Sequence, residues 1–274
     1  MSEYFADYDI RQIPLSQIPG FHLSMIMCDP MHSIHLGFAQ IAVGSMLVVL
    51  AMQGEWGMFA GRRKERLNAA LRKAYGDFVT FCRRSGAHTS QPTFDAGMLN
   101  KAETDLDFPS FNAKAHNTRW VVMWIAVLLY TKQSPGPEAA LFWGLADVLH
   151  IMHEIPGPWL TEELAVRFYN SGMVALLSFA HLALAAKRNN IPLWPCKPKM
   201  HQVDHLCQLV LQTRLQPSYA WAFADEDFNG RMVKMAYKVE HPLQFSKRTM
   251  EKYCLQMFLS VKQAAVRSSG DDRA

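Results

Sequence analysis

Hydrophobic residues recur every three or four positions along most of this chain, and that spacing predicts amphipathic helices. Short segments rich in proline and glycine, such as SPGP (134–137) and IPGP (155–158), separate the helical stretches. Asn112 is the expected N-cap of the third helix. The helices are predicted over residues 30–53, 62–84, 113–132, 138–153, 160–188, 198–215, 225–239 and 246–265.

Two places depart from the helical pattern. FHLSMIMCD (21–29) is a short apolar run of the kind found in strands buried on both faces. A second strand is expected near Tyr219. The predicted fold is therefore mainly α, with one or two strands.

Composition narrows the class of protein. Half of the 274 residues are hydrophobic and 19% are charged, as in a globular chain. The net charge of +4 is below the surplus typical of a dedicated nucleic-acid coat. Five cysteines without a CxxC pair argue against a zinc ribbon or a disulfide framework, and they favour an intracellular location. The apolar runs 41–52 and 121–130 are shorter than the roughly 20 residues of a bilayer span, so no membrane partner is expected.

MIMCDPMHSIHLG (25–37) combines an acid with two histidines. Asp29 followed by Pro30 is typical of a helix N-cap and first helical position, where the carboxylate accepts hydrogen bonds from free N–H groups. His32 and His35 share a helix face and are candidates for a metal site, with packing or surface residues as the alternative interpretation, which is the usual one for isolated pairs. Two interpretations of Asp29 stay open at this point, namely a catalytic carboxylate at the end of a core strand and a helix cap.

KPKMHQVDHL (197–206) places His201 and His205 on one helix face. Helical zinc sites use the same spacing, but the zincin pattern needs a glutamate where Gln202 stands. The reversed pattern needs a glutamate where the shorter Asp204 stands. A zinc site and a polar helix start with partly buried histidines are the two interpretations.

WAFADEDFNGRMVKMAYKV (221–239) contains three acids, among them Asp225 and Glu226, at the N-terminus of the helix predicted over 225–239. The helix dipole favours negative charge there, which is sufficient to explain them. A basic face follows, suited to phosphates and equally to solvent. The candidate DNA-binding cations of this region are Arg231, Lys234, Lys238, Lys247 and Arg248.

Four segments occur in order, namely MIMCDPMHSIHLG, FNAKAHNTRWVVMWIAVLL, KPKMHQVDHL and YAWAFADEDFNGRMVKMA. In this order they resemble the C-terminal part of transposase-like proteins from mobile elements of algae and other protists. Those proteins are distantly similar to CACTA-type and Kyakuja–Dileera–Zisupton transposases. The resemblance covers most of residues 20–260. It implies a small remnant of an RNase H-like α/β core beside a large helical domain, and a D…D…E triad that holds Mg²⁺ or Mn²⁺ for DNA strand cleavage and transfer.

The resemblance assigns roles motif by motif. Asp29 corresponds to the second Asp of the triad, and Glu226 to the final Glu with Asp225 beside it as a metal ligand. His201 and His205 match a K-P-K-x-H-x-x-x-H element, and with His32 they are candidates for structural or metal-binding roles. The implied organisation is an irregular segment (1–20), a partial RNase H-like strand and helix (21–60), a helical insertion (61–195), C-terminal helices completing the core (196–265) and a disordered tail (266–274).

The first Asp of such a triad lies a three-strand meander before the second. Asp7 and Asp9 stand only about 20 residues before Asp29, too few for three strands of roughly five residues with turns. We therefore expect a transposase-derived fragment, inactive alone and nuclear, that contacts DNA and self-associates or works with an upstream domain outside this chain. The alternatives are a non-enzymatic helical module that binds nucleic acid or protein, and a zinc hydrolase using His201 and His205.

Overall fold

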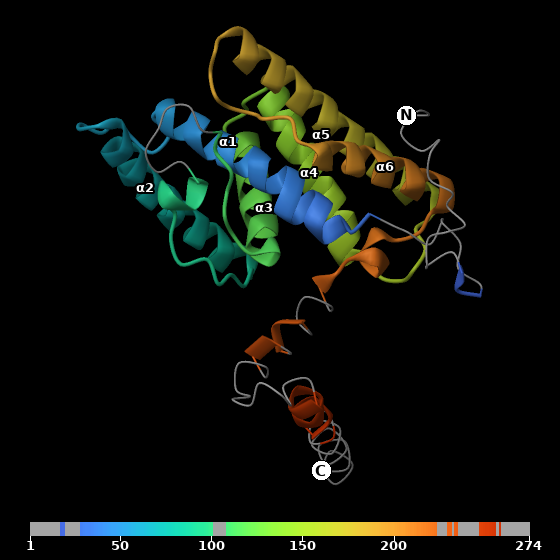
Figure 1. Ribbon diagram of the computed structural model, residues 1–274. Helices are drawn as coiled ribbons and strands as arrows, with labels where there is room; N and C mark the ends of the chain where they lie inside the picture. The colour runs from blue at the N-terminus through green and yellow to red at the C-terminus, as the bar shows by residue number, and fades with distance from the viewer. Residues whose placement is uncertain are drawn as a thin grey trace, which may run out of the picture. The chain divides into compact units, whose positions relative to one another are not determined.

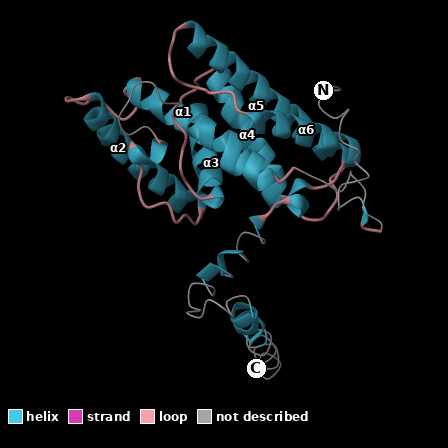
Figure 2. Ribbon diagram, viewed as in Figure 1, coloured by secondary structure: helices cyan, strands magenta, loops and turns pink. Residues whose placement is uncertain are grey.

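The computed structural model describes residues 17–19, 28–100, 108–223, 229–231, 233–234, 247–255 and 258. Within them the protein is mainly α-helical and has no β-strand (Figure 2). The chain divides into two compact units, Met1–Trp221 and Ala222–Ala274. The first unit contains a π-helix (Met31–Ala39) that continues into α1 (Gln40–Met52), followed by α2 (Arg63–Ser85), α3 (Ala115–Thr131), α4 (Pro137–Glu154), α5 (Glu162–Arg188) and α6 (Pro198–Thr213) (Figure 1).

The helices predicted between residues 30 and 215 are confirmed, with ends that local hydrogen bonds explain. At the start of α2, the Arg62 N–H donates to Glu65 Oε2 at 2.9 Å. The same helix ends at Gly86, whose φ of 68° is one that glycine adopts without strain. At the start of α5, Thr161 Oγ1 accepts a hydrogen bond from the Leu164 N–H at 3.2 Å. These caps satisfy backbone groups that a helix leaves unpaired at its ends.

The beginning of α3 differs from the prediction. The helix starts at Ala115 after an extended Lys114, so Asn112 is not its N-cap. The Asn112 N–H instead donates to Met98 O at 2.7 Å, and Gln40 Nε2 donates to Ala113 O at 2.7 Å. These tertiary hydrogen bonds hold the segment before α3 away from helical geometry.

The strand predictions are not confirmed in the described residues. Most of 21–29 lies outside them, and its last two residues, Cys28 and Asp29, are not in a strand. Tyr219 lies in a 3₁₀ helix, Pro217–Ala220, so the strand predicted there is wrong. The nearest β-type pairing is an isolated antiparallel bridge between Trp159 and Leu215.

The core forms where α4 packs between α3 and α5, with α5 also against α6 and the π-helix against α3 and α6. Aromatic side chains fill it, among them the fully buried Phe38, Phe142 and Phe168. Gly144 of α4 allows close approach to α5, since a Cβ there would lie 2.5 Å from Ser171 O. Close packing of α4 on α5 therefore depends on the absence of a side chain at Gly144.

Two helical stretches, Met31–Met52 and Glu162–Arg188, are long and apolar enough to cross a bilayer by length and composition alone. The first is 78% buried inside the protein, as expected of a core helix. The second is 28% buried, with one face against α4 and α6. This is weak evidence for a membrane span and agrees with the prediction of no membrane partner.

Candidate functional site

Asp29 lies two residues before the π-helix (Met31–Ala39), separated from it by Pro30, and its side chain caps the first N–H of that helix. Its Oδ1 accepts a hydrogen bond from the Met31 N–H at 2.9 Å, and its Oδ2 contacts Nδ1 of His32. Its backbone oxygen accepts from the N–H and the hydroxyl of Ser33, at 3.0 and 2.8 Å. The side chain is 24% exposed. The capping interpretation is thus confirmed, and the carboxylate is held in a defined orientation at the protein surface.

The two histidines predicted to share a face have different surroundings. His32 is 44% exposed and contacts Asp29, whereas His35 is fully buried. Nε2 of His35 lies 2.9 Å from Nε2 of His153 near the end of α4. The ring of His153 also lies 4.8 Å from that of Trp221. His35 therefore belongs to a buried histidine pair that joins the π-helix to α4.

Burial keeps this pair neutral. It lowers the pKa of His35 to about 4 and that of His153 to about 3, because a buried imidazolium loses its hydration. The cation of Arg119 adds to the effect at both rings. In the neutral pair one ring donates an N–H and the other accepts it. Sequence reasoning identified neither His153 nor Arg119 as site residues.

Arg119 itself is 92% buried, with 8% of its surface exposed, which is unusual for arginine. Its guanidinium forms an ion pair with Glu154 and lies over the ring of Trp120, 4.6 Å from its centroid. The signal that could have revealed it is an arginine at the start of the otherwise apolar segment 119–129. Such a charge needs a partner on a neighbouring element.

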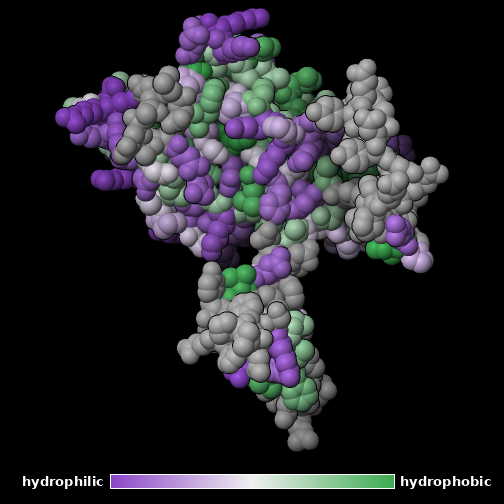
Figure 3. All heavy atoms as spheres, viewed as in Figure 1, coloured by the Kyte–Doolittle hydropathy of each residue, from purple (hydrophilic) through white to green (hydrophobic). Residues whose placement is uncertain are grey.

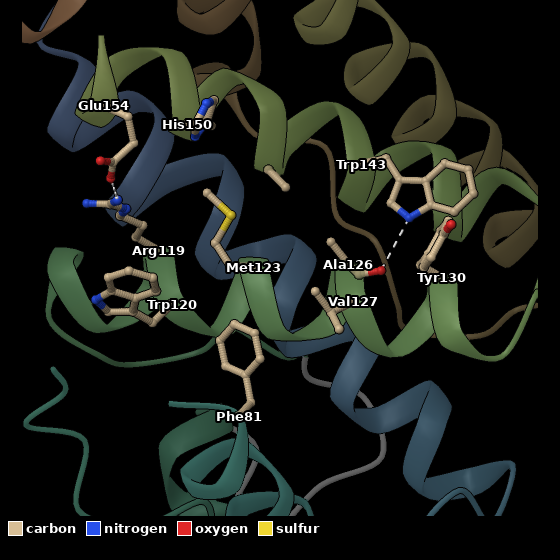
Figure 4. A pocket seen from close by; sticks show the side chains of 11 residues that line it. Phe81, Arg119, Trp120, Met123, Ala126, Val127, Tyr130, Trp143, His150 and Glu154 are labelled. Carbon is tan, nitrogen blue, oxygen red and sulfur yellow. Dashed lines mark hydrogen bonds and ion pairs between the residues drawn. The ribbon is translucent and has the colours of Figure 1, made fainter. Parts of the chain in front are cut away.

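The Arg119–Glu154 pair closes one end of a groove between α3 and α4 (Figure 4). Tyr130 and Trp143 lie at the other end, with ring centroids 6.2 Å apart, and Phe81 of α2 borders one side. The groove has a volume of about 730 Å³ and a mostly apolar lining. Its size is within the range of small-molecule sites.

His201 and His205 lie together on α6, as their spacing predicts. Their Nε2 atoms are 2.9 Å apart, and both residues are exposed rather than partly buried. The carboxylate of Asp204 instead accepts a hydrogen bond from Gln208 at 3.0 Å. Across the described part of the chain no group of three or more His, Cys, Asp or Glu side chains is placed to hold a metal ion. The described residues therefore offer this pair no third ligand of those types.

The remaining predicted site residues belong to the second unit. Asp225, Glu226 and Lys238 lie outside the described residues. The other predicted DNA-binding cations are in helical conformation and exposed, and Lys247 Nζ is 3.9 Å from Glu251 Oε1. The exposed cations are Arg231, Lys234, Lys247 and Arg248.

No protein-family model, curated protein or solved structure matches this chain.

Proposed function

We propose that this chain derives from a DDE-type transposase with an RNase H-like core, and that Asp29, Glu226 and Asp225 are its divalent-metal ligands. The proposal is carried by one observation. Asp29, in the motif that resembles the second Asp of the triad, presents a partly exposed carboxylate whose orientation is held by the Met31 N–H. Pre-organised carboxylates of this kind are what a catalytic metal site requires.

The donor chemistry fits Mg²⁺ or Mn²⁺, because both prefer carboxylate oxygens. Such ions activate the attacking oxygen and stabilise the leaving oxygen of a phosphodiester. In this proposal Asp29 supplies one ligand, oriented by the first turn of the π-helix, and His32 contacts the same carboxylate. The chain provides two carboxylates of the triad, so strand transfer needs a further acidic ligand. A protein with this role works on DNA, in the nucleus.

Mn²⁺ binding tests the proposal without requiring activity. Electron paramagnetic resonance of added Mn²⁺ should show binding by the wild type that Asp29→Asn and Glu226→Gln each weaken at least tenfold. Asp77→Asn, an exposed acid on α2, is the matched control and should bind as the wild type does. Supercoiled plasmid with Mg²⁺ should show little or no nicking by the chain alone. Unchanged Mn²⁺ binding in Asp29→Asn would refute the assignment.

A second candidate function, a nucleic-acid-binding module, is favoured by the charge of α2. Residues 62–85 carry eight basic and two acidic side chains, a surplus of six, whereas the whole chain has a surplus of four. The core-facing positions of α2 include the buried Leu71, Ala74 and Phe78. At about 100° per residue, six exposed cations lie on the opposite face. They are Arg62, Arg66, Arg72, Lys73, Arg83 and Arg84.

Duplex phosphates fit this face best. Gly76 lies on this face with open space around it, so a phosphate backbone can approach closely there. The face has no exposed aromatic side chain for stacking single-stranded bases. The end of the first unit where α2 lies is accordingly hydrophilic in Figure 3.

Fluorescence anisotropy with a random-sequence DNA duplex in EDTA tests this candidate separately from metal chemistry. Replacing Arg66 and Lys73 with Glu should flatten the plot of log affinity against log salt by about 1.8, at about 0.9 per lost phosphate contact. Lys187→Glu with Lys197→Glu is the control, since both lysines are exposed elsewhere. An equal effect of the control pair would exclude α2 as the contact surface.

A further inference from the structure

Helix α5 is hydrophobic on two opposite faces. One face contributes to the core through buried residues such as Phe168, Ala175 and Phe179. On the other face Val166, Val174, Leu177 and Leu184 are 40%, 45%, 65% and 55% exposed. At about 100° per residue the second set is centred opposite the first. Helices that are hydrophobic all round are normally covered on all sides.

Two polar residues, Asn170 and His181, complete this exposed face, and both are solvent-exposed. We call these two and the four hydrophobic residues the outward stripe. From Val166 to Leu184 it extends about 27 Å at 1.5 Å per residue. Figure 3 shows hydrophobic side chains along the edge of the first unit where α5 runs in Figure 1. The stripe is long enough to pack along a second helix.

The order of residues in the outward stripe is self-complementary. When α5 is placed antiparallel to a copy of itself about a two-fold axis between Ala175 and Leu176, Val174 faces Leu177 and Asn170 faces His181. Such an axis makes each contact occur twice. At the centre of the stripe apolar residues therefore meet apolar residues, and an amide meets an imidazole that can hydrogen-bond to it.

The charges at the two ends follow the same symmetry. Glu163 and Arg188 are both exposed and lie on the side of α5 that carries the outward stripe. They are equally far from the midpoint of the helix, so the antiparallel arrangement brings Glu163 of each copy to Arg188 of the other. A parallel arrangement would instead place like charges together, which is unfavourable. The charge pattern thus selects one orientation.

We propose that α5 is a self-association surface, on which a second copy of this chain packs its own α5 antiparallel along the outward stripe. This inference does not depend on the proposed function. Packing of the two helices covers Leu177 and its hydrophobic neighbours, and the two Glu163–Arg188 pairs set the direction. The crossing angle of such a pair is typically near 20°.

A membrane is the competing occupant of this face, because α5 is apolar and long. Asn170 and His181 in the middle of the stripe, with charges at both ends, oppose burial in hydrocarbon. The opposite face of α5 is packed against α4 and α6, so it cannot be surrounded by lipid without breaking those contacts. A second copy satisfies the polar and apolar positions together.

Sedimentation velocity over about 1–100 μM, the range of a weak to moderate complex, tests the surface. The wild type should shift from monomer to dimer with concentration, and Leu177→Glu should remain monomeric. Val127→Glu is the matched control, because Val127 is an exposed hydrophobic residue of α3, 48% exposed. A monomeric wild type, or equal loss in both variants, would overturn the proposal. Circular dichroism of Leu177→Glu should match that of the wild type.

Charge exchange tests the antiparallel orientation. Glu163→Arg and Arg188→Glu should each weaken dimerisation about tenfold, since each variant creates two like-charge contacts. The double variant Glu163→Arg/Arg188→Glu should regain wild-type affinity. If the double variant instead lost as much affinity as the two single variants together, the Glu163–Arg188 pairing between copies would be refuted. Flotation with neutral phosphatidylcholine vesicles completes the test, because vesicle binding lost in Leu177→Glu would assign the face to a membrane and overturn self-association.

Discussion

The buried histidine pair should make the first unit sensitive to acid. His35 on the π-helix and His153 on α4 contact each other through Nε2, and burial lowers the pKa of His35 to about 4 and of His153 to about 3. In the unfolded chain both rings titrate near 6.5. Between these values the unfolded state binds more protons than the folded state, so the free energy of unfolding decreases as the pH falls. The loss begins near pH 6.5 and is complete for His35 near pH 4.

The size of the effect follows from the shift. At 1.36 kcal/mol per pH unit, one such histidine costs about 2 kcal/mol of stability between pH 7 and pH 5. The two rings together lower the free energy of unfolding by about 4 kcal/mol between pH 7 and pH 5, because at pH 5 both are protonated in the unfolded chain and neither is protonated in the folded protein. A typical domain has a total stability of about 5–15 kcal/mol, so the change is large.

Urea unfolding followed by circular dichroism at pH 7, 6 and 5 measures this dependence. The matched variant is His153→Gln, which keeps a hydrogen-bonding group beside His35 and removes one titrating ring. It should lose about 2 kcal/mol less than the wild type between pH 7 and pH 5. Carboxylates titrate in both proteins and cancel in the comparison. Parallel pH profiles for the two proteins would contradict the prediction, because they would show that His153 does not have a depressed pKa.

Three further predictions concern stability. Gly144→Val should destabilise the first unit by about 1–3 kcal/mol, because the new side chain would collide with Ser171 O of α5. Gly76→Ala has open space around it and should instead stabilise the protein by about 0.4–1 kcal/mol. Thermal unfolding compares the two variants, and equal effects on stability would contradict the packing argument. Asp29→Ala should lower the free energy of unfolding by about 1 kcal/mol, because the cap is lost, and Asp29→Asn should lower it by less. Urea titrations measure both changes. Thr161→Ala should cost about 1 kcal/mol for the same reason at α5, and an unchanged midpoint would show that this cap is dispensable.

Helix positions were largely predictable from the sequence because they depend on local signals. Hydrophobic spacing, together with the proline- and glycine-rich segments 134–137 and 155–158, marks where helices begin and stop within a few residues. The prediction for Asn112 was wrong because hydrogen bonds to Met98 and Gln40, distant in sequence, hold that segment extended. Local rules fail where tertiary contacts compete for the same backbone groups.

Short-range patterns were enough to predict that this is a mainly helical protein and that His201 and His205 share a face of α6, and they offered capping as one of two interpretations of Asp29. Each of these follows from residues within one or two helical turns. Three further features are visible only once the helices are packed together. His35 pairs with His153 and not with His32, Arg119 forms an ion pair with Glu154, and α5 has a second hydrophobic face that is exposed. Those features depend on which helices pack together, and that is set by close packing between segments far apart in the chain.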